Sequence, residues 1–273
     1  MSAAAGDAVG GVVGSAVGAP SGDAAAQPDE VAAYALRLGD DALVLAQRMG
    51  EWIAAAPELE EDVALANIAL DLLGQARTLL TYAGTADGRT EDELAYLRDA
   101  EGFRNVHLVE RPDDGDFAYC VARLLGFSAY QVELYTRLAS STDHTLAAIS
   151  AKAVTEVAYH RDHATQWVLR LGDGTEESRI RMQAGLDAVW PYLAELFETD
   201  ELVARLGDLA VDPAGLHEPA LAYVRGVVHR ATLSVPEVAV APGGGRRGEH
   251  TDALAPLLAE MQALPRAMPG VRW

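Results

Sequence analysis

The sequence predicts an all-α fold, a bundle of four long helices with additional C-terminal helices, and three observations favour it. Apolar residues recur at intervals of three and four from Asp29 onward, which is the period of a helix that buries one face. No segment of useful length shows the two-residue alternation of a half-buried strand. The predicted connections are unequal, with one long connection between two short ones.

The first two long helices are predicted over residues 28–56 and 58–83. Asp29 is a suitable N-cap for the first helix, and Pro57 ends it. The second helix begins with acidic residues that suit the positive end of a helix dipole, namely Glu58, Glu60, Glu61 and Asp62. The spacing that predicts its buried face comes from Leu65, Ile68, Ala69, Leu72, Ala76 and Leu79.

A long crossover follows, with a short helix predicted over 91–99 and a second segment over 103–110. The third and fourth long helices are predicted over 116–139 and 144–171. Two helical hairpins joined by one long crossover are typical of a ferritin-like four-helix bundle.

The C-terminal part is predicted to add helices over 175–198, 219–233 and 252–264, with a kink at Pro191 in the first of them. The Gly-Gly-Gly-Arg-Arg-Gly segment that begins at Gly243 is predicted to be a flexible loop. We therefore expect one ferritin-like helical domain over residues 29–273.

The N-terminal residues 1–28 differ from the rest of the chain. They are rich in Ala, Gly, Val, Ser and Asp, and they contain no Lys or Arg. A secretory signal peptide needs a basic start and a sustained apolar run, so we predict a disordered N-terminal extension instead. We also expect that no apolar stretch of the chain reaches the length of a membrane span.

Charge and cysteine content exclude several classes of partner and site. The 273 residues have a formal net charge of −20, which disfavours nucleic acid and anionic membrane surfaces as partners. Cys120 is the single cysteine, so the chain has no intrachain disulfide and no cysteine-rich metal site. These features predict a protein of a reducing compartment, the cytoplasm.

One segment of the fourth long helix is similar to an incomplete metal motif. Di-iron carboxylate bundles use one Glu from each of two helices and a Glu-x-x-His pair, at i and i+3, from each of the other two. Glu156 and His160 are instead separated by four positions, and Val157 occupies the position three before the histidine. Because valine does not bind metal, this half of the motif is broken.

The second helix is incomplete as well, since residues 58–83 contain no histidine and Asp71 has Gly74 at i+3. The carboxylates on the other two helices are too ordinary in a helical sequence to count as ligands; they are Asp40, Asp41, Glu51 and Glu133. The sequence therefore predicts no metal site, no cofactor bound by this chain and no catalytic residue.

Five residues stand as candidates for a vestigial site: Asp71, Lys152, Glu156, His160 and His163. In one interpretation they are surface residues or core polar groups with ordinary partners. In a second they form a metal-free network that fills the former metal cavity, in which Lys152 replaces a cation's charge against Asp71 or Glu156. In a third they belong to a metal site with unusual ligands, although two histidines at i and i+3 without a third ligand are a weak zinc signal.

Several segments together resemble a known family. They cover residues 36–52, 56–60, 62–77, 146–154, 156–160, 211–213, 250–251 and 258–262. Over residues 34–273 the chain is similar to the PaaC subunit family of the bacterial phenylacetyl-CoA epoxidase, also called 1,2-phenylacetyl-CoA oxygenase.

The resemblance implies a ferritin-like structural subunit that lacks the metal ligands. Such a subunit pairs, in a hetero-oligomer, with a catalytic di-iron subunit of the PaaA type and the same fold. Other epoxidase subunits and a flavin and iron–sulfur reductase complete the system, which epoxidises the aromatic ring of phenylacetyl-CoA with O₂. An independent di-metal carboxylate oxygenase and a generic helical scaffold protein are the alternative functions.

Overall fold

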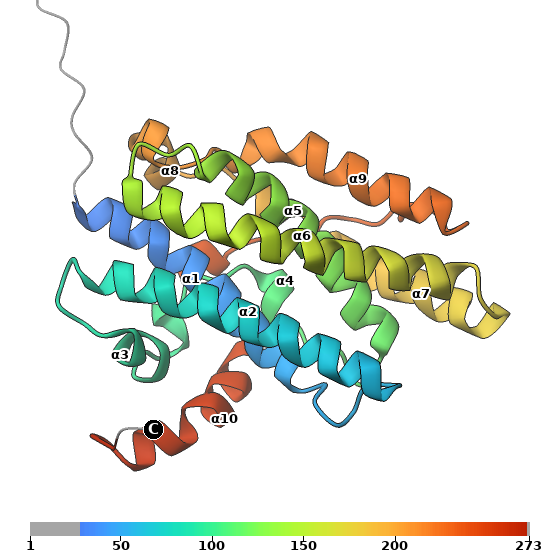
Figure 1. Cartoon of the computed structure of the whole chain (residues 1–273), viewed down its shortest axis with the longest axis horizontal. Helices are drawn as coiled ribbons and strands as arrows, with labels where there is room; N and C mark the ends of the chain where they lie inside the picture. The colour runs from blue at the N-terminus through green and yellow to red at the C-terminus, as the bar shows by residue number, and fades with distance from the viewer. Residues whose placement is uncertain (1–27, 272–273) are drawn as a thin grey trace, which may run out of the picture.

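The computed structural model describes residues 28–271, and the chain forms no β-strand within them (Figure 1). The four long helices of the bundle are α1 (Pro28–Gly50), α2 (Leu59–Gly84), α5 (Phe117–Leu138) and α6 (His144–Gly172). Residues 1–27, and with them nearly all of the predicted extension, lie outside the described part. Pro28 is already the first residue of α1.

Shorter helices fill the crossover and the C-terminal part. They are α3 (Glu91–Tyr96), α4 (His107–Glu110), α7 (Glu176–Val189), α8 (Glu201–Leu206), α9 (His217–Arg230) and α10 (Leu254–Ala267). The 3₁₀ turns are η1 (Ala100–Gly102), η2 (Trp190–Tyr192), η3 (Ala194–Phe197), η4 (Gly207–Leu209), η5 (Pro213–Leu216) and η6 (Gly245–Arg247). The two hairpins, α1–α2 and α5–α6, and the long crossover between them agree with the prediction.

Two predicted helices extend well beyond the observed ones. The first helix ends at Gly50 rather than at residue 56, because the chain then turns and Ala54 adopts a left-handed conformation with φ 66°. The helix predicted over 175–198 ends at Val189, and two 3₁₀ turns follow it. Pro191 lies in the first of these turns and has no N–H with which to continue an α-helix.

The helix α2 packs on α1 through the predicted apolar face, and its Leu65, Ile68, Leu72, Ala76 and Leu79 are buried. Within residues 28–271, α2 is also long and apolar enough to cross a membrane by length and composition. The prediction that no stretch of the chain reaches that length is therefore wrong. Only 44% of its most apolar window is buried, so part of this apolar surface faces outward.

Most of α5 is buried, and α6, α7 and α9 pack against it. Gly185 on α7 permits one of these close approaches. A Cβ atom at this position would lie 2.9 Å from the backbone of Ala118 on α5, closer than real Cβ atoms come. The absence of a side chain therefore sets how tightly α7 packs on the bundle.

The glycine-rich segment at residues 243–248 is not a flexible loop, so this prediction is wrong. The backbone N–H groups of Gly244 and Gly245 both donate to Oε1 of buried Glu195, each at 2.9 Å. A Cβ at Gly245 would lie 1.9 Å from the carbonyl oxygen of Asn105. Glycine is required here for close packing on the crossover, and the segment is fixed in place.

Candidate functional site

The polar residues of α2 and α6 meet along one line, which we call the α2–α6 seam; its members are Glu61, Asp71, Gln75, Glu156, His160, His163 and Trp167. The two helices run antiparallel and lie side by side (Figure 1). Residues that are far apart in sequence therefore pair across the seam. Of the five predicted candidates, only Lys152 makes no contact across it.

Glu61 is the most completely paired carboxylate of the seam. His163 Nε2 lies 2.7 Å from its Oε1 atom, and Trp167 Nε1 donates to Oε2 at 2.6 Å. Trp167 in turn packs edge-on against Phe117, which packs against Trp52. The sequence interpretation treated Glu61 only as an acidic residue of the helix start. Its position four before Leu65, on the apolar face, is the signal that it points inward.

His160 pairs with Asp71, and its Nε2 atom lies 3.1 Å from Oδ2 of that residue. The imidazole is fully buried, and its Nδ1 atom has no hydrogen-bond partner among the described residues. Burial lowers the pKa of His160, and the neighbouring Asp71 carboxylate only partly offsets this. The geometry therefore assigns a neutral imidazole whose Nε2–H donates to Asp71.

Gln75 and Glu156 form the third contact of the seam, in which Gln75 Nε2 donates to Oε2 at 3.0 Å. Lys152 Nζ lies 3.5 Å from Glu156 Oε1, but the lysine side chain is 78% exposed. Lys152 thus pairs with one of its two predicted partners, on the outside of the bundle. It does not place a positive charge in the interior, and that part of the network hypothesis is wrong.

The residues around His160 do not fit a di-iron centre. Val157, at the position where the motif needs a carboxylate, is buried, as is Leu72 on the facing helix. Within residues 28–271, no group of three or more His, Cys, Asp or Glu side chains is placed to hold a metal ion. Each polar residue of the seam instead has another side chain as its partner, so the arrangement joins two helices.

A second polar cluster, which the sequence interpretation missed, lies against α1. We call it the α1 network; its members are Asp40, Asp41, Arg98, Glu110, Arg246 and His250. Asp40 accepts hydrogen bonds from both Nη atoms of Arg98 and from the backbone N–H of Arg104. Asp41 accepts from Arg246 at 2.7 Å and from the N–H of Val106 at 2.9 Å. Both carboxylates are buried, and burial raises the pKa of Asp41 although Arg246 opposes the shift.

Glu110 and His250 complete the α1 network. His250 Nδ1 lies 3.1 Å from Glu110 Oε2, and Nε2 lies 3.1 Å from the carbonyl oxygen of Phe103. Since both ring nitrogens face acceptors, the geometry favours the doubly protonated imidazolium. Burial lowers the pKa of His250, but the hydrogen bond and charge of Glu110 outweigh it and the net shift is upward. The network ties the crossover and the C-terminal segment to α1.

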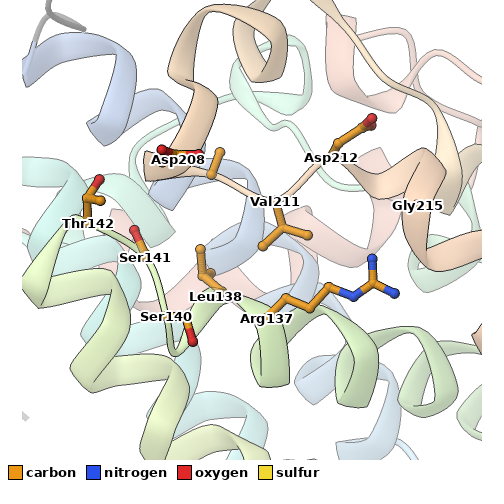
Figure 2. A pocket seen from close by; sticks show the side chains of 10 residues that line it. Arg137, Leu138, Ser140, Ser141, Thr142, Asp208, Val211, Asp212 and Gly215 are labelled. Atoms are coloured by element: carbon orange, nitrogen blue, oxygen red, sulfur yellow. The ribbon is translucent and has the colours of Figure 1, made fainter.

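Two hollows on the surface of the described chain are candidates for ligand sites. The larger, of ≈ 440 Å³, lies between the α5–α6 connection and the 208–215 segment (Figure 2). Its polar lining consists of Arg137, Ser140, Ser141, Thr142, Asp208 and Asp212, with no histidine or cysteine. The smaller, of ≈ 300 Å³, lies over Glu61 and His163 at one end of the seam. In the larger hollow, the hydroxyl of Ser141 donates to the carbonyl oxygen of Leu209 at 2.7 Å.

The sequence profile of the family described as phenylacetic acid catabolic protein matches residues 17–273. The chain belongs to this family. Within the family, it is 48% identical over 248 residues to the C subunit of the 1,2-phenylacetyl-CoA epoxidase of Escherichia coli (strain K12). The alignment covers 90% of this chain and all of the relative. The resemblance predicted from the sequence segments is therefore confirmed.

A solved structure supports the fold of this family member. The protein from Synechococcus described as having aldehyde deformylating oxidase activity superposes with a TM-score of 0.56, at 15% sequence identity. The match covers 77% of this chain and 94% of that protein. At this identity the likeness concerns the fold alone, and with it the ferritin-like prediction is confirmed.

Proposed function

We propose that this chain is a non-catalytic structural subunit of a multicomponent phenylacetyl-CoA 1,2-epoxidase in the cytoplasm, and that it serves aerobic phenylacetate catabolism. The support for the pathway is the full-length similarity to the C subunit of such an epoxidase. The support for a structural role is the α2–α6 seam. There, Val157 stands where a ligand is needed, and His160 hydrogen-bonds to Asp71.

The proposal assigns the chemistry to a partner chain. That partner is a catalytic subunit of the PaaA type, with a di-iron centre and the same fold, and a flavin and iron–sulfur reductase supplies its electrons. This chain binds no cofactor and supports the shape of the catalytic subunit through a shared helical face. An interface of this obligate kind buries roughly 2,000 Å² or more and is rich in apolar residues.

Reconstitution of the epoxidase from purified subunits tests the proposal. Omission of this chain is expected to abolish ring epoxidation while the catalytic partner keeps its iron. A complex that contains the double variant Asp71→Asn/His160→Gln is expected to keep its activity, because these residues only join two helices. Full activity without this chain would exclude the structural role. Loss of activity in the folded, assembled double variant would favour an independent di-metal oxygenase.

A further inference from the structure

The outward face of α2 is apolar although no element of the described chain covers it. Leu59, Val63, Leu70 and Leu73 are 76%, 54%, 64% and 43% exposed. They recur at three- and four-residue intervals with partly exposed Ala66 between them, so they form one stripe opposite the face that packs on α1. We call these five residues the α2 stripe. Water-facing helix surfaces are normally polar, and contiguous exposed apolar surface marks interaction sites.

The dimensions of the α2 stripe suit a helix as its occupant. From Leu59 to Leu73 the helix advances about 21 Å at ~1.5 Å per residue. Gly74 lies beside the stripe, and a Cβ there would meet no atom within 4 Å, so the surface is open at this point. A ridge of about four large apolar side chains on another helix would pack on a stripe of this length.

The charges around the α2 stripe select among possible occupants. Its N-terminal end adjoins the ≈ 300 Å³ hollow, whose lining includes the carboxylates of Glu58, Glu60 and Asp162 and one basic side chain, that of Arg170, which lies over the Trp167 ring. On α2 itself no Lys or Arg precedes Arg77, and Arg77 already pairs with Glu91 at 3.4 Å. This acidic end repels the anionic headgroups of a membrane. A second copy of this chain also has a net charge of −20, and its α2 has no basic side chain besides Arg77 to pair with the acidic end.

We propose that the α2 stripe is the docking surface for a different subunit of the assembly, one that presents a helix with an apolar ridge and with Lys or Arg side chains at the end that meets Glu58 and Glu60. The inference rests on the proposed function, because it takes the partner from the same multicomponent enzyme. The apolar contact supplies most of the affinity, and the acidic end sets the orientation of the partner helix.

Co-purification with the other epoxidase subunits of the same organism tests the inference. The variant Leu70→Glu/Leu73→Glu is expected to bind at least about a hundredfold more weakly, since two carboxylates replace the centre of the contact. Its thermal unfolding is expected to match that of the unaltered chain. The matched control is Ile180→Glu on α7, a site 53% exposed, which is expected to leave assembly unchanged. Glu58→Lys/Glu60→Lys is expected to weaken binding most at low salt.

Other outcomes overturn the inference in distinct ways. Unimpaired assembly of the folded Leu70→Glu/Leu73→Glu variant shows that the partner docks elsewhere, and the proposed function stands. Sedimentation of the lone chain as a dimer that this variant abolishes identifies a second copy as the occupant. Binding of the lone chain to vesicles with anionic lipid identifies a membrane. If the unaltered chain joins none of the epoxidase subunits, the proposed function itself fails.

Discussion

The α2–α6 seam and the α1 network are both polar, but they differ in burial and in charge. In the α1 network the carboxylates of Asp40, Asp41 and Glu110 are fully buried and are matched by Arg98, Arg246 and an imidazolium. In the seam Glu61 is buried as well, but Asp71 is 38% exposed and burial lowers the pKa of its partner His160. The network holds the crossover and the C-terminal segment on α1, whereas the seam joins two helices that already pack. We therefore expect Asp71 and His160 to contribute less to the stability of the fold than the carboxylates of the α1 network.

The largest expected difference concerns one carboxylate from each region. Asp41→Ala removes the carboxylate paired with the buried guanidinium of Arg246 and leaves Arg246 Nη2 and the N–H of Val106 without an acceptor. It is expected to cost about 3–5 kcal/mol of unfolding free energy. Asp71→Ala removes a half-exposed acceptor from neutral His160 and is expected to cost about 1 kcal/mol. Urea denaturation of both variants measures the two losses. Equal losses of unfolding free energy would contradict the claim that the α1 network stabilises the fold more than the seam does.

His250 gives the α1 network a defined pH dependence. Its pKa in the folded chain is raised, so its contribution to stability is complete below the pKa of the unfolded chain. The contribution is lost as the pH rises through the folded pKa. His250→Gln is expected to cost about 2 kcal/mol at acidic pH, where it removes a charged hydrogen bond to Glu110. Denaturation at pH values from about one unit below the ordinary histidine pKa to about two and a half units above it checks this. A stability difference from the unaltered chain that widens as the pH rises would contradict it.

His160 is expected to show the opposite trend, because its pKa is lowered on folding. Its neutral form is the one that the folded chain accommodates, so its contribution is complete above the unfolded pKa. That contribution is lost as the pH falls toward the folded pKa. The variant His160→Gln is therefore expected to show a smaller loss of stability on acidification than the unaltered chain. An unchanged acid limb of the stability profile would show that His160 does not titrate as its burial requires.

The smallest expected effect belongs to Lys152. Its side chain is mostly exposed and lies 3.5 Å from Glu156 on the same helix, so the pair is screened by water. Lys152→Ala is expected to change the unfolding free energy by less than about 0.5 kcal/mol. A loss of several kcal/mol in urea denaturation would mean that Lys152 does neutralise the seam.

The sequence predicted the fold better than it predicted the polar clusters. Apolar periodicity and the helix-ending Pro and Gly residues were enough to predict the two hairpins, the crossover and the buried face of α2. The sequence also placed Asp71 and His160 in one candidate site, but their direct contact was not predicted. The α1 network was missed because its arginines lie in irregular segments 58 and 205 residues away from their aspartates, where no helical period places them. Asp40 and Asp41 therefore looked like ordinary helix carboxylates.

The glycine-rich segment shows a second reason for failure. Glycine permits both flexible chain and close backbone contact, and sequence alone does not separate the two. At Gly245 the backbone is fixed by its hydrogen bond to Glu195 and by close packing on the carbonyl oxygen of Asn105. Both residues are distant from Gly245 in the sequence. The same limit explains why the α2 stripe was not foreseen, because exposure depends on which elements leave α2 uncovered.

The central claim is that this chain carries no di-iron centre and that the chemistry occurs in a partner chain. Its most direct test is anaerobic loading of the purified, folded chain with Fe(II), followed by desalting and elemental analysis. The account predicts iron far below one atom per chain, because Val157 and the paired residues of the seam leave no ligand set. Two iron atoms retained per chain would contradict it.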